Sequence, residues 1–219
     1  MSPKSFFLSR EIHDYLLDHG RRPDAVQQSL IEATLALGPV AGMQIAPEQG
    51  AFMTMLTQLV GARYAVEVGT FTGYSALCIA RGLAPGGRLL CCDVSEEWTA
   101  IGRRHWERDG VADRIELVIA PALDTLRGLS SDATIDIAFV DADKPNYANY
   151  LSELVPRMRP NGLILVDNVL WGGRVIDASD TDENTVAIRA FNDLVVNDAR
   201  VDTVMLPVSD GLTLLRKRP

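Results

Sequence analysis

Two apolar segments of the chain end in the same kind of polar residues. AFVDADKPNY runs into Asp141 and Lys144, and GLILVDNVLWGG runs into Asp167 and Asn168. Each segment has the composition of a buried strand. If the two strands are neighbours in a parallel sheet, about 4.8 Å apart, their carboxyl ends lie at one level. The polar residues that follow these ends are then within reach of a common ion.

The chemistry of this set favours a hard cation. Asp141, Asp167 and Asn168 offer two carboxylates and an amide oxygen, with no thiolate or imidazole. Oxygen ligands of this kind suit Mg²⁺, with Ca²⁺ and Mn²⁺ as alternatives, and leave coordination positions for water and substrate oxygens. We therefore expect a divalent cation at these strand ends.

Lys144 follows Asp141 by three residues, on the turn that leaves the same strand. A lysine beside a cation is pushed towards its neutral form and can serve as a general base for a nearby hydroxyl group. In the alternative interpretation, Asp141 and Asp143 cap a helix that starts near Pro145, and Lys144 is solvated.

A glycine-bearing turn predicts a nucleoside site. In VEVGTFTGYSAL, Gly69 and Gly73 flank a turn from a strand into a helix, where a ligand can approach the backbone closely. The spacing G-x-x-x-G differs from the G-x-G-x-x-G of dinucleotide sites, which favours a ligand without phosphates. Asp93, twenty positions after Gly73, can accept hydrogen bonds from ribose hydroxyls, and Glu67 adds an acid beside a cationic ligand such as S-adenosylmethionine (SAM). An ordinary tight turn and a helix-capping acid are the alternative.

The rest of the chain supplies an α/β frame for these residues. Short apolar runs alternate with helical patterns, and such runs predict a parallel sheet covered by helices on both faces. The runs cover residues 64–68, 88–94, 115–120, 135–141 and 162–167.

The two ends of the chain follow other patterns. After a helix predicted over about 184–198, RVDTVMLPV and GLTLLRKR are separated only by Ser209 and Asp210. So short a link permits a hairpin, which makes the last strand antiparallel to the rest. Three helical patterns precede the first strand, and we expect them over the edge of the sheet or at a dimer contact. We predict one domain over 1–219, with a helical cap at 1–60 and a core at 61–219.

Composition excludes several classes of protein. The 219 residues are 47% hydrophobic and carry a formal charge of −8, which opposes binding to a nucleic-acid backbone. The N-terminal segment has too few consecutive apolar residues for a secretory signal or a membrane span. We expect a cytoplasmic protein that has no nucleic-acid or membrane partner.

Several motifs carry a family resemblance. MQIAPEQGAFM, VEVGTFTGYSAL, FVDADKPNY and LVDNVLWGG resemble, in this order, the motifs of the cation-dependent O-methyltransferases, which include caffeoyl-CoA and bacterial catechol methyltransferases. The match spans about 40 to 217. It implies a Rossmann-like class I methyltransferase fold, whose mostly parallel sheet has seven strands and ends in an antiparallel hairpin. It also implies N-terminal helices and a homodimer.

The resemblance also implies roles for single residues. Asp141, Asp167 and Asn168 would bind the cation, and Lys144 would be the catalytic base. The residues implied to contact the methyl donor are Met43, Glu67, Gly69, Phe71, Ser75, Asp93, Ala122 and Asp141. Of these, Asp93 would lie at the ribose, Ser75 at the methionine carboxylate and Ala122 near the adenine. Ala120 stands where relatives often have glycine, which weakens the adenine assignment.

These inferences predict SAM-dependent O-methylation of a small aromatic acceptor with two adjacent hydroxyls. Mg²⁺ would chelate both oxygens, Lys144 would take a proton, and the oxygen would attack the methyl group. The acceptor is left open between a catechol, a natural-product intermediate and a caffeoyl-type ester. The basic pairs at 21–22 and 103–104 are candidates to meet CoA phosphates, or are ordinary surface arginines. An NAD-dependent oxidoreductase, a non-catalytic binding protein and a metal-independent methyltransferase are the rival interpretations.

Overall fold

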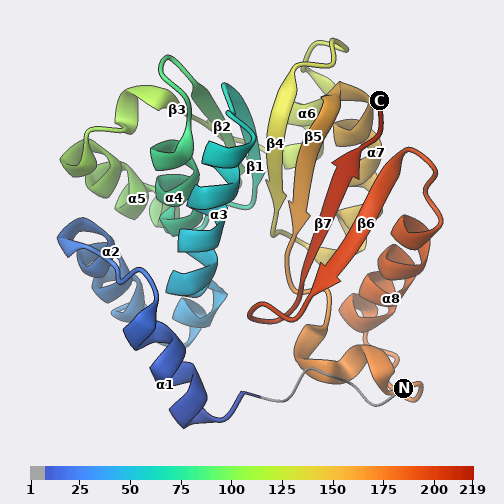
Figure 1. The fold of residues 1–219 in the computed structure, drawn as a ribbon, viewed down its shortest axis with the longest axis horizontal. Helices are drawn as coiled ribbons and strands as arrows, with labels where there is room; N and C mark the ends of the chain where they lie inside the picture. Colours follow the sequence, from blue (N-terminus) through green and yellow to red (C-terminus); the bar gives the residue numbers. More distant parts are fainter. Residues whose placement is uncertain (1–7) are drawn as a thin grey trace.

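The computed structural model describes residues 8–219, which form one sheet flanked by helices (Figure 1). The strands are β1 Tyr64–Val68, β2 Arg88–Asp93, β3 Ile115–Ile119, β4 Ile135–Val140, β5 Met158–Val166, β6 Val201–Leu206 and β7 Leu212–Lys217. Their order in the sheet is β3-β2-β1-β4-β5-β7-β6. The order places β4 beside β5, as the argument for a shared cation site requires.

The helices alternate with the strands. They are α1 Arg10–His19, α2 Ala25–Leu35, α3 Pro47–Leu59, α4 Tyr74–Gly82, α5 Glu96–Asp109, α6 Ala122–Arg127, α7 Tyr147–Arg157 and α8 Glu183–Val196. Short 3-10 turns are η1 Gly38–Met43, η2 Ala112–Arg114, η3 Lys144–Asn146 and η4 Trp171–Ile176. Among the described helices, none is both long and apolar enough to cross a membrane.

The direction of the strands confirms the predicted fold. β1, β2, β3, β4 and β5 pair in parallel, and β7 is antiparallel to both of its neighbours, β5 and β6. Between β4 and β5, Val140 pairs with Val166, so Asp141 and Asp167 each follow a paired residue. The carboxyl ends of these two strands therefore lie level with each other.

β5 is longer than the sequence pattern predicts. It begins at Met158, which pairs with Ile135, and the register shifts before the regular pairing of Ile137 with Leu163. Asn161 has a positive φ of 60° in this stretch. The polar and glycine residues of the irregular part break the apolar run, which is why the sequence shows only the later half of the strand.

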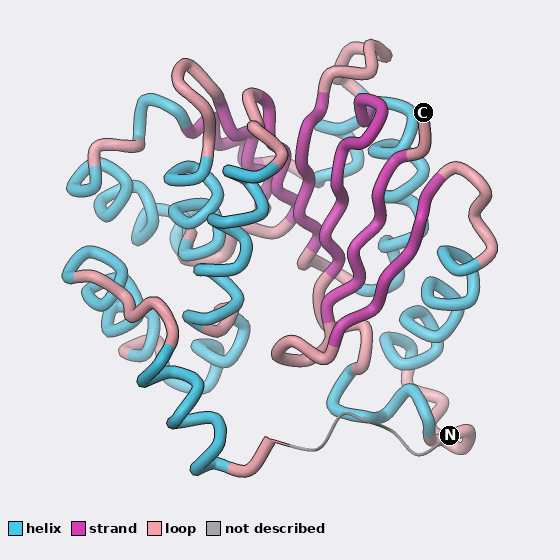
Figure 2. Tube along the Cα trace, viewed as in Figure 1, coloured by secondary structure: helices cyan, strands magenta, loops and turns pink. Residues whose placement is uncertain are grey.

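Helices lie on both sides of the sheet (Figure 2), and an apolar core fills the space on each side. Residues of one strand alternate between them: Val66 and Val68 of β1 face the core that holds Leu151 of α7 and Phe191 of α8. Ala65 faces the other core, which α2, α3, α4 and α5 cover. The sheet is thus covered on both faces, as predicted from its apolar strands.

The N-terminal helices belong to one of these helical layers. α3 packs along α4 and α2 packs along α5, so both cover a face of the sheet, not its edge alone. α3 starts with Pro47 at its first position, where proline is favoured because no backbone N–H is needed. From there its side chains reach the ends of the strands.

Candidate active site

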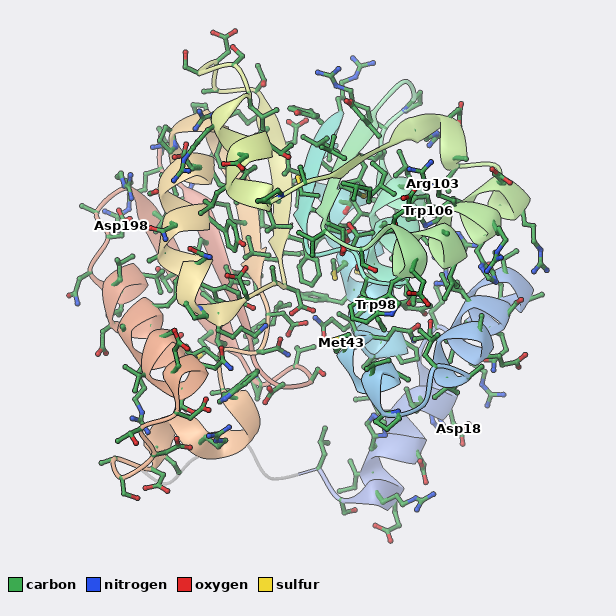
Figure 3. All side chains as sticks on the ribbon, turned by 180° about the vertical axis from the view of Figure 1, so that it is seen from behind. Asp18, Met43, Trp98, Arg103, Trp106 and Asp198 are labelled. Carbon is green, nitrogen blue, oxygen red and sulfur yellow. The ribbon has the colours of Figure 1, made fainter. Side chains whose placement is uncertain are left out.

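A cavity of about 890 Å³ opens at the carboxyl ends of the central strands. Ten of the eleven residues predicted for the site line it. They are Met43, Gly69, Phe71, Ser75, Asp93, Ala122, Asp141, Lys144, Asp167 and Asn168. In the view from behind, Met43 and Trp98 point into the region between the two halves of the molecule (Figure 3). The structure therefore brings the predicted donor and cation residues to one hollow.

The glycine turn needs its glycines for steric reasons. Gly69 has φ +88°, and a Cβ there would lie 1.9 Å from the backbone oxygen of Asp141. Gly73 has φ +82° and precedes α4, and a Cβ there would lie 2.5 Å from the ring of Trp106. The turn is thus packed against the cation-side strand end at one glycine and against α5 at the other.

Asp93 fixes the conformation of this turn. Its Oδ2 accepts hydrogen bonds from the backbone N–H groups of Thr70 and Phe71, each at 2.8 Å. Its Oδ1 accepts from the N–H of Ser95 at 2.7 Å, and the Ser95 hydroxyl in turn caps α5. The helix-capping alternative is therefore wrong for Asp93 itself. A carboxylate keeps acceptor capacity beyond three bonds, and Asp93 faces the cavity.

Glu67 is the one predicted residue that does not line the cavity. Its side chain is fully buried, and burial raises its pKa to about 7. The thiol of Cys91 donates to Oε2 at 3.4 Å, and Oε1 has no hydrogen-bond partner. A buried oxygen without a partner is costly, so a donor from a bound ligand would stabilise it. Its contact with the methyl donor stays a prediction.

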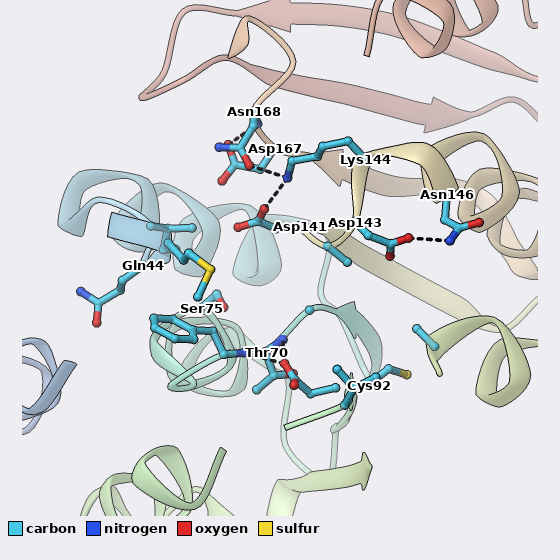
Figure 4. Close-up of a pocket in the computed structure, with 18 of the residues that line it drawn as sticks. Gln44, Thr70, Ser75, Cys92, Asp141, Asp143, Lys144, Asn146, Asp167 and Asn168 are labelled. Atoms are coloured by element: carbon cyan, nitrogen blue, oxygen red, sulfur yellow. Dashed lines mark hydrogen bonds and ion pairs between the residues drawn. The ribbon is translucent and has the colours of Figure 1, made fainter. Parts of the chain in front are cut away.

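The cation-side residues converge on the ammonium group of Lys144 (Figure 4). Nζ donates to Oδ1 of Asp141 at 3.0 Å and to Oδ1 of Asn168 at 2.7 Å. Lys144 is only 7% exposed, so the alternative of a solvated lysine is wrong. A positive charge thus already lies between two of the oxygens predicted to hold a cation.

Asp167 is the most buried acid of the set, with 2% exposure. Its Oδ1 accepts from the backbone N–H of Asn168 and its Oδ2 from Nε2 of Gln49, both at 2.7 Å. Burial, and then the charge of Asp141, raise its pKa to about 7. Asn168 has φ +57°, a left-handed conformation that asparagine tolerates better than most residues. Two acids this close favour a cation between them.

Two residues of the site were missed by sequence reasoning. Tyr147 accepts from Nζ of Lys144 at 2.6 Å and donates to the backbone oxygen of Asp167 at 3.1 Å. Gln49 comes from α3, 118 positions from Asp167 in the sequence. The spacing of three residues between Lys144 and Tyr147 is a signal that was present. Nothing local marks Gln49, because its partner is distant in the chain.

The far wall of the cavity comes from η4, α8 and the last hairpin. Trp171, Asn184, Ser209 and Asp210 line it. The indole ring of Trp171 lies 5.6 Å from Nζ of Lys144, within the range of a cation–π contact. Trp171 therefore forms part of the pocket.

Comparison with known proteins agrees with this geometry. The model of an O-methyltransferase family matches residues 19–218. The chain belongs to this O-methyltransferase family. A probable caffeoyl-CoA O-methyltransferase 1 of Dictyostelium discoideum is 37% identical over 95% of this chain and 93% of its own. A catechol O-methyltransferase domain-containing protein 1 of Mus musculus is 37% identical over 93% of this chain and 78% of that protein.

Solved structures of similar proteins agree as well. An O-methyltransferase from Bacillus cereus in complex with SAH has a TM-score of 0.86 and 31% identity, over 95% of this chain and 97% of that one. The protein is thus an O-methyltransferase, and the family membership rules against the oxidoreductase alternative. In this methyltransferase, the glycine turn and the strand-end oxygens line one cavity.

Proposed function

We propose that this methyltransferase transfers the methyl group of SAM to one hydroxyl of a vicinal dihydroxy-aromatic small molecule, with the help of a divalent cation. The observation that carries the proposal is the position of the Lys144 ammonium, between Asp141 and Asn168 and across one cavity from the glycine turn. A cation site and a donor turn that share one cavity fit a reaction in which the acceptor oxygen is activated beside the methyl group.

The donor half of the cavity supports SAM as the cofactor. Similar structures were described in complex with SAH, from Bacillus cereus, and with SAM, in a methyltransferase of tomaymycin synthesis from Streptomyces achromogenes at 27% identity. Asp93 lines the cavity and has acceptor capacity for ribose hydroxyls, and Ser75, in the first turn of α4, would meet the methionine carboxylate.

The cation half of the cavity fits Mg²⁺ or a related ion. Its donors are the carboxylates of Asp141 and Asp167 and the amide oxygen of Asn168. Residues 8–219 contain no group of three His, Cys, Asp or Glu placed to hold a metal, so the amide oxygen would be the third protein ligand. A bound divalent cation would supply the positive charge that makes the acceptor hydroxyls more acidic.

Different residues of the cavity have different roles in the proposed reaction. Lys144, in its neutral form, accepts the hydroxyl proton at Nζ, and Tyr147 holds that nitrogen by a hydrogen bond of 2.6 Å. The glycine turn, fixed by Asp93, positions the methyl donor in line with the acceptor oxygen. Trp171 lines the acceptor side of the pocket, where it can pack against an aromatic ring.

A methyl-transfer assay tests this proposal. Labelled SAM is supplied with catechols or with monophenols, each in Mg²⁺ or in EDTA, to the wild type and to Lys144→Ala and Asp167→Ala. We expect turnover only of vicinal diols, lost in EDTA and in both variants. Equal turnover of monophenols in EDTA would overturn the cation and acceptor assignments and leave the O-methyltransferase assignment intact.

We also propose that the enzyme is a cytoplasmic homodimer that contacts its partner through α1. No residue of α1 is buried, and Ile12, Tyr15 and Leu16 are 40%, 63% and 38% exposed. A surface of this kind is stabilised when a second copy covers it. Light scattering after gel filtration should give twice the chain mass, and Tyr15→Glu with Leu16→Glu should reduce it. A monomeric wild type would contradict the proposal.

A further inference from the structure

The charges of the cavity restrict the kind of acceptor that can enter it. Among the described residues, the acids lining the cavity are Asp93, Asp141, Asp143, Asp167 and Asp210. Lys144 is the single basic residue of the same lining. It lies within the cation set, where Asp141 and Asn168 accept its hydrogen bonds. No basic side chain of residues 8–219 is therefore available in the lining for a negative group of the acceptor.

Asp210 places one of these acids on the acceptor wall. Its Oδ1 accepts from the backbone N–H of Gly172 at 2.6 Å, and its carbonyl accepts from the N–H of Leu170 at 3.0 Å. These bonds hold the turn of the last hairpin against the segment that carries Trp171. The Asp210 carboxylate is thus held at the backbone next to Trp171, and both residues line the cavity.

The arginine nearest to this wall in the sequence is already paired. Arg174 donates from Nε and Nη2 to the carboxylate of Asp180, at 2.6 and 3.1 Å, and lies 3.7 Å from Asp182. A second negative group would therefore have to compete with two carboxylates for it. Arg174 also does not line the cavity.

The second arginine of this region holds the loop backbone. Arg189 donates to the carbonyl oxygens of Val175 at 3.0 Å, Asp180 at 2.9 Å and Arg174 at 3.0 Å. Its planar guanidinium group thus holds the backbone of the loop after Trp171 in one conformation. Like Arg174, it is occupied within the wall and not free for a ligand.

The basic pairs considered for CoA lie elsewhere. Arg21, Arg22, Arg103 and Arg104 do not line the cavity. Arg22 pairs with Asp18 on the surface at 2.7 Å. In Figure 3, Arg103 lies on the outer side of α5, near Trp106 and away from Met43.

From these contacts we propose that the acceptor carries no phosphate group, and that its substituent away from the two hydroxyls is neutral or positively charged. Asp210 would select against negatively charged substituents at this wall by like-charge repulsion. The inference deepens the proposed function and rests on it. It separates this enzyme from relatives whose names specify caffeoyl-CoA, since CoA carries several phosphate charges.

The test compares kcat/KM for dopamine, neutral catechol, caffeate and caffeoyl-CoA, all with SAM and Mg²⁺. We expect kcat/KM for caffeoyl-CoA to be at least tenfold lower than for dopamine, and kcat/KM for caffeate to lie between the two. Each unfavourable charge contact should lower kcat/KM by about tenfold or less. The difference should shrink as salt is added, because ions screen exposed charges.

Two variants assign the effect to Asp210. Asp210→Asn keeps an oxygen for the Gly172 N–H and removes the charge, and should lower the dopamine-to-caffeate ratio by about 3- to 10-fold. Asp198→Asn makes the same change of net charge far from Met43 in Figure 3 and should leave the ratio unchanged. If caffeoyl-CoA equals or exceeds dopamine, the inference is wrong and the proposed function stands. If no catechol is methylated while monophenols are, the proposed function itself fails.

Discussion

The donor half and the cation half of the cavity are built in different ways. The donor half is a backbone structure: two glycines with positive φ, and N–H groups of Thr70 and Phe71 held by Asp93. The cation half consists of side chains, with the ammonium of Lys144 between oxygens from two strand ends. The two halves meet at one point, where Gly69 packs against the backbone of Asp141.

Because of this difference, the two halves of the cavity should be sensitive to different kinds of substitution. A backbone turn depends on residues within about 25 positions of sequence and is damaged by added atoms. A charged cluster depends on residues from distant segments and is damaged when one charge is removed, because the others are left buried and uncompensated. Substitutions in the two halves should therefore fail in distinct ways.

The largest effect is expected at the point where the halves meet. Gly69→Ala adds a Cβ 1.9 Å from a backbone oxygen at φ +88°, so it should destabilise the protein by about 4 kcal/mol or more and abolish SAM binding. Gly86→Ala is the matched control, with φ +73° and no atom within 4 Å of the added Cβ, and should cost about 1 kcal/mol. Urea unfolding measures both. Similar losses would mean that the contact with Asp141 is unimportant.

Removal of the buried Lys144 side chain should affect the reaction more than SAM binding. Lys144→Met is expected to lower kcat by about 10²- to 10⁴-fold at saturating Mg²⁺, because the proposed base is lost. SAM affinity, measured by calorimetry, should change little, since the donor turn does not use this side chain. Lys217→Met, at the end of β7, is the control and should keep full activity. A Lys144→Met enzyme with normal kcat would exclude the lysine as the base.

Glu67 gives a pH test of the donor half. Its pKa in the folded protein, about 7, is above the value of 4.5 that we take for the unfolded chain. Between these values the folded protein holds a proton that the unfolded chain has released, so the free energy of unfolding falls as pH rises and levels off above 7. Glu67→Gln removes this decline, and relative to wild type it should gain up to about 3 kcal/mol between pH 5 and 8.

Urea unfolding at the two pH values checks this prediction. Glu97→Gln, on the exposed first turn of α5, is the control and should follow the wild type. Parallel curves for the wild type and Glu67→Gln would show that Glu67 is ionised throughout.

The smallest effect is expected at a residue that supports the cation half from outside. Gln49→Leu removes the donor to Oδ2 of Asp167 and should weaken Mg²⁺ binding by about 10-fold, up to 100-fold. Calorimetric titration with Mg²⁺ measures this without turnover. Gln58→Leu, exposed on the same helix, should bind Mg²⁺ as the wild type does. An unchanged Mg²⁺ affinity in Gln49→Leu would mean that the hydrogen bond from Gln49 to Asp167 does not support cation binding.

The same contrast explains how much the sequence predicted. The fold followed from apolar runs and from the two-residue link before the last strand, whereas the sequence only assumed that β4 and β5 are neighbours, which the structure shows. The donor turn was readable because its glycines and Asp93 are close in the chain and their roles are steric. Asp141 and Asp167 were readable because each directly follows an apolar run.

Contacts that form only when distant segments pack together could not be predicted from the sequence. Gln49 meets Asp167 because α3 packs along α4, and no local pattern encodes that pairing. Glu67 looked like an acid beside the ligand, but its strand places it fully inside the protein. No role was predicted for Tyr147, and its hydroxyl binds the lysine because α7 starts directly after the 3-10 turn that carries Lys144.

The hydrogen bonds from Arg189 to the loop backbone have a consequence for how this enzyme can change over evolution. These hydrogen bonds go to carbonyl oxygens of the loop after Trp171. Every amino acid supplies a carbonyl, so loop side chains other than those paired with Arg174 can be exchanged while these backbone bonds are kept. Such a loop can take new side chains, by selection or in a library, while Trp171 keeps its place in the lining of the cavity.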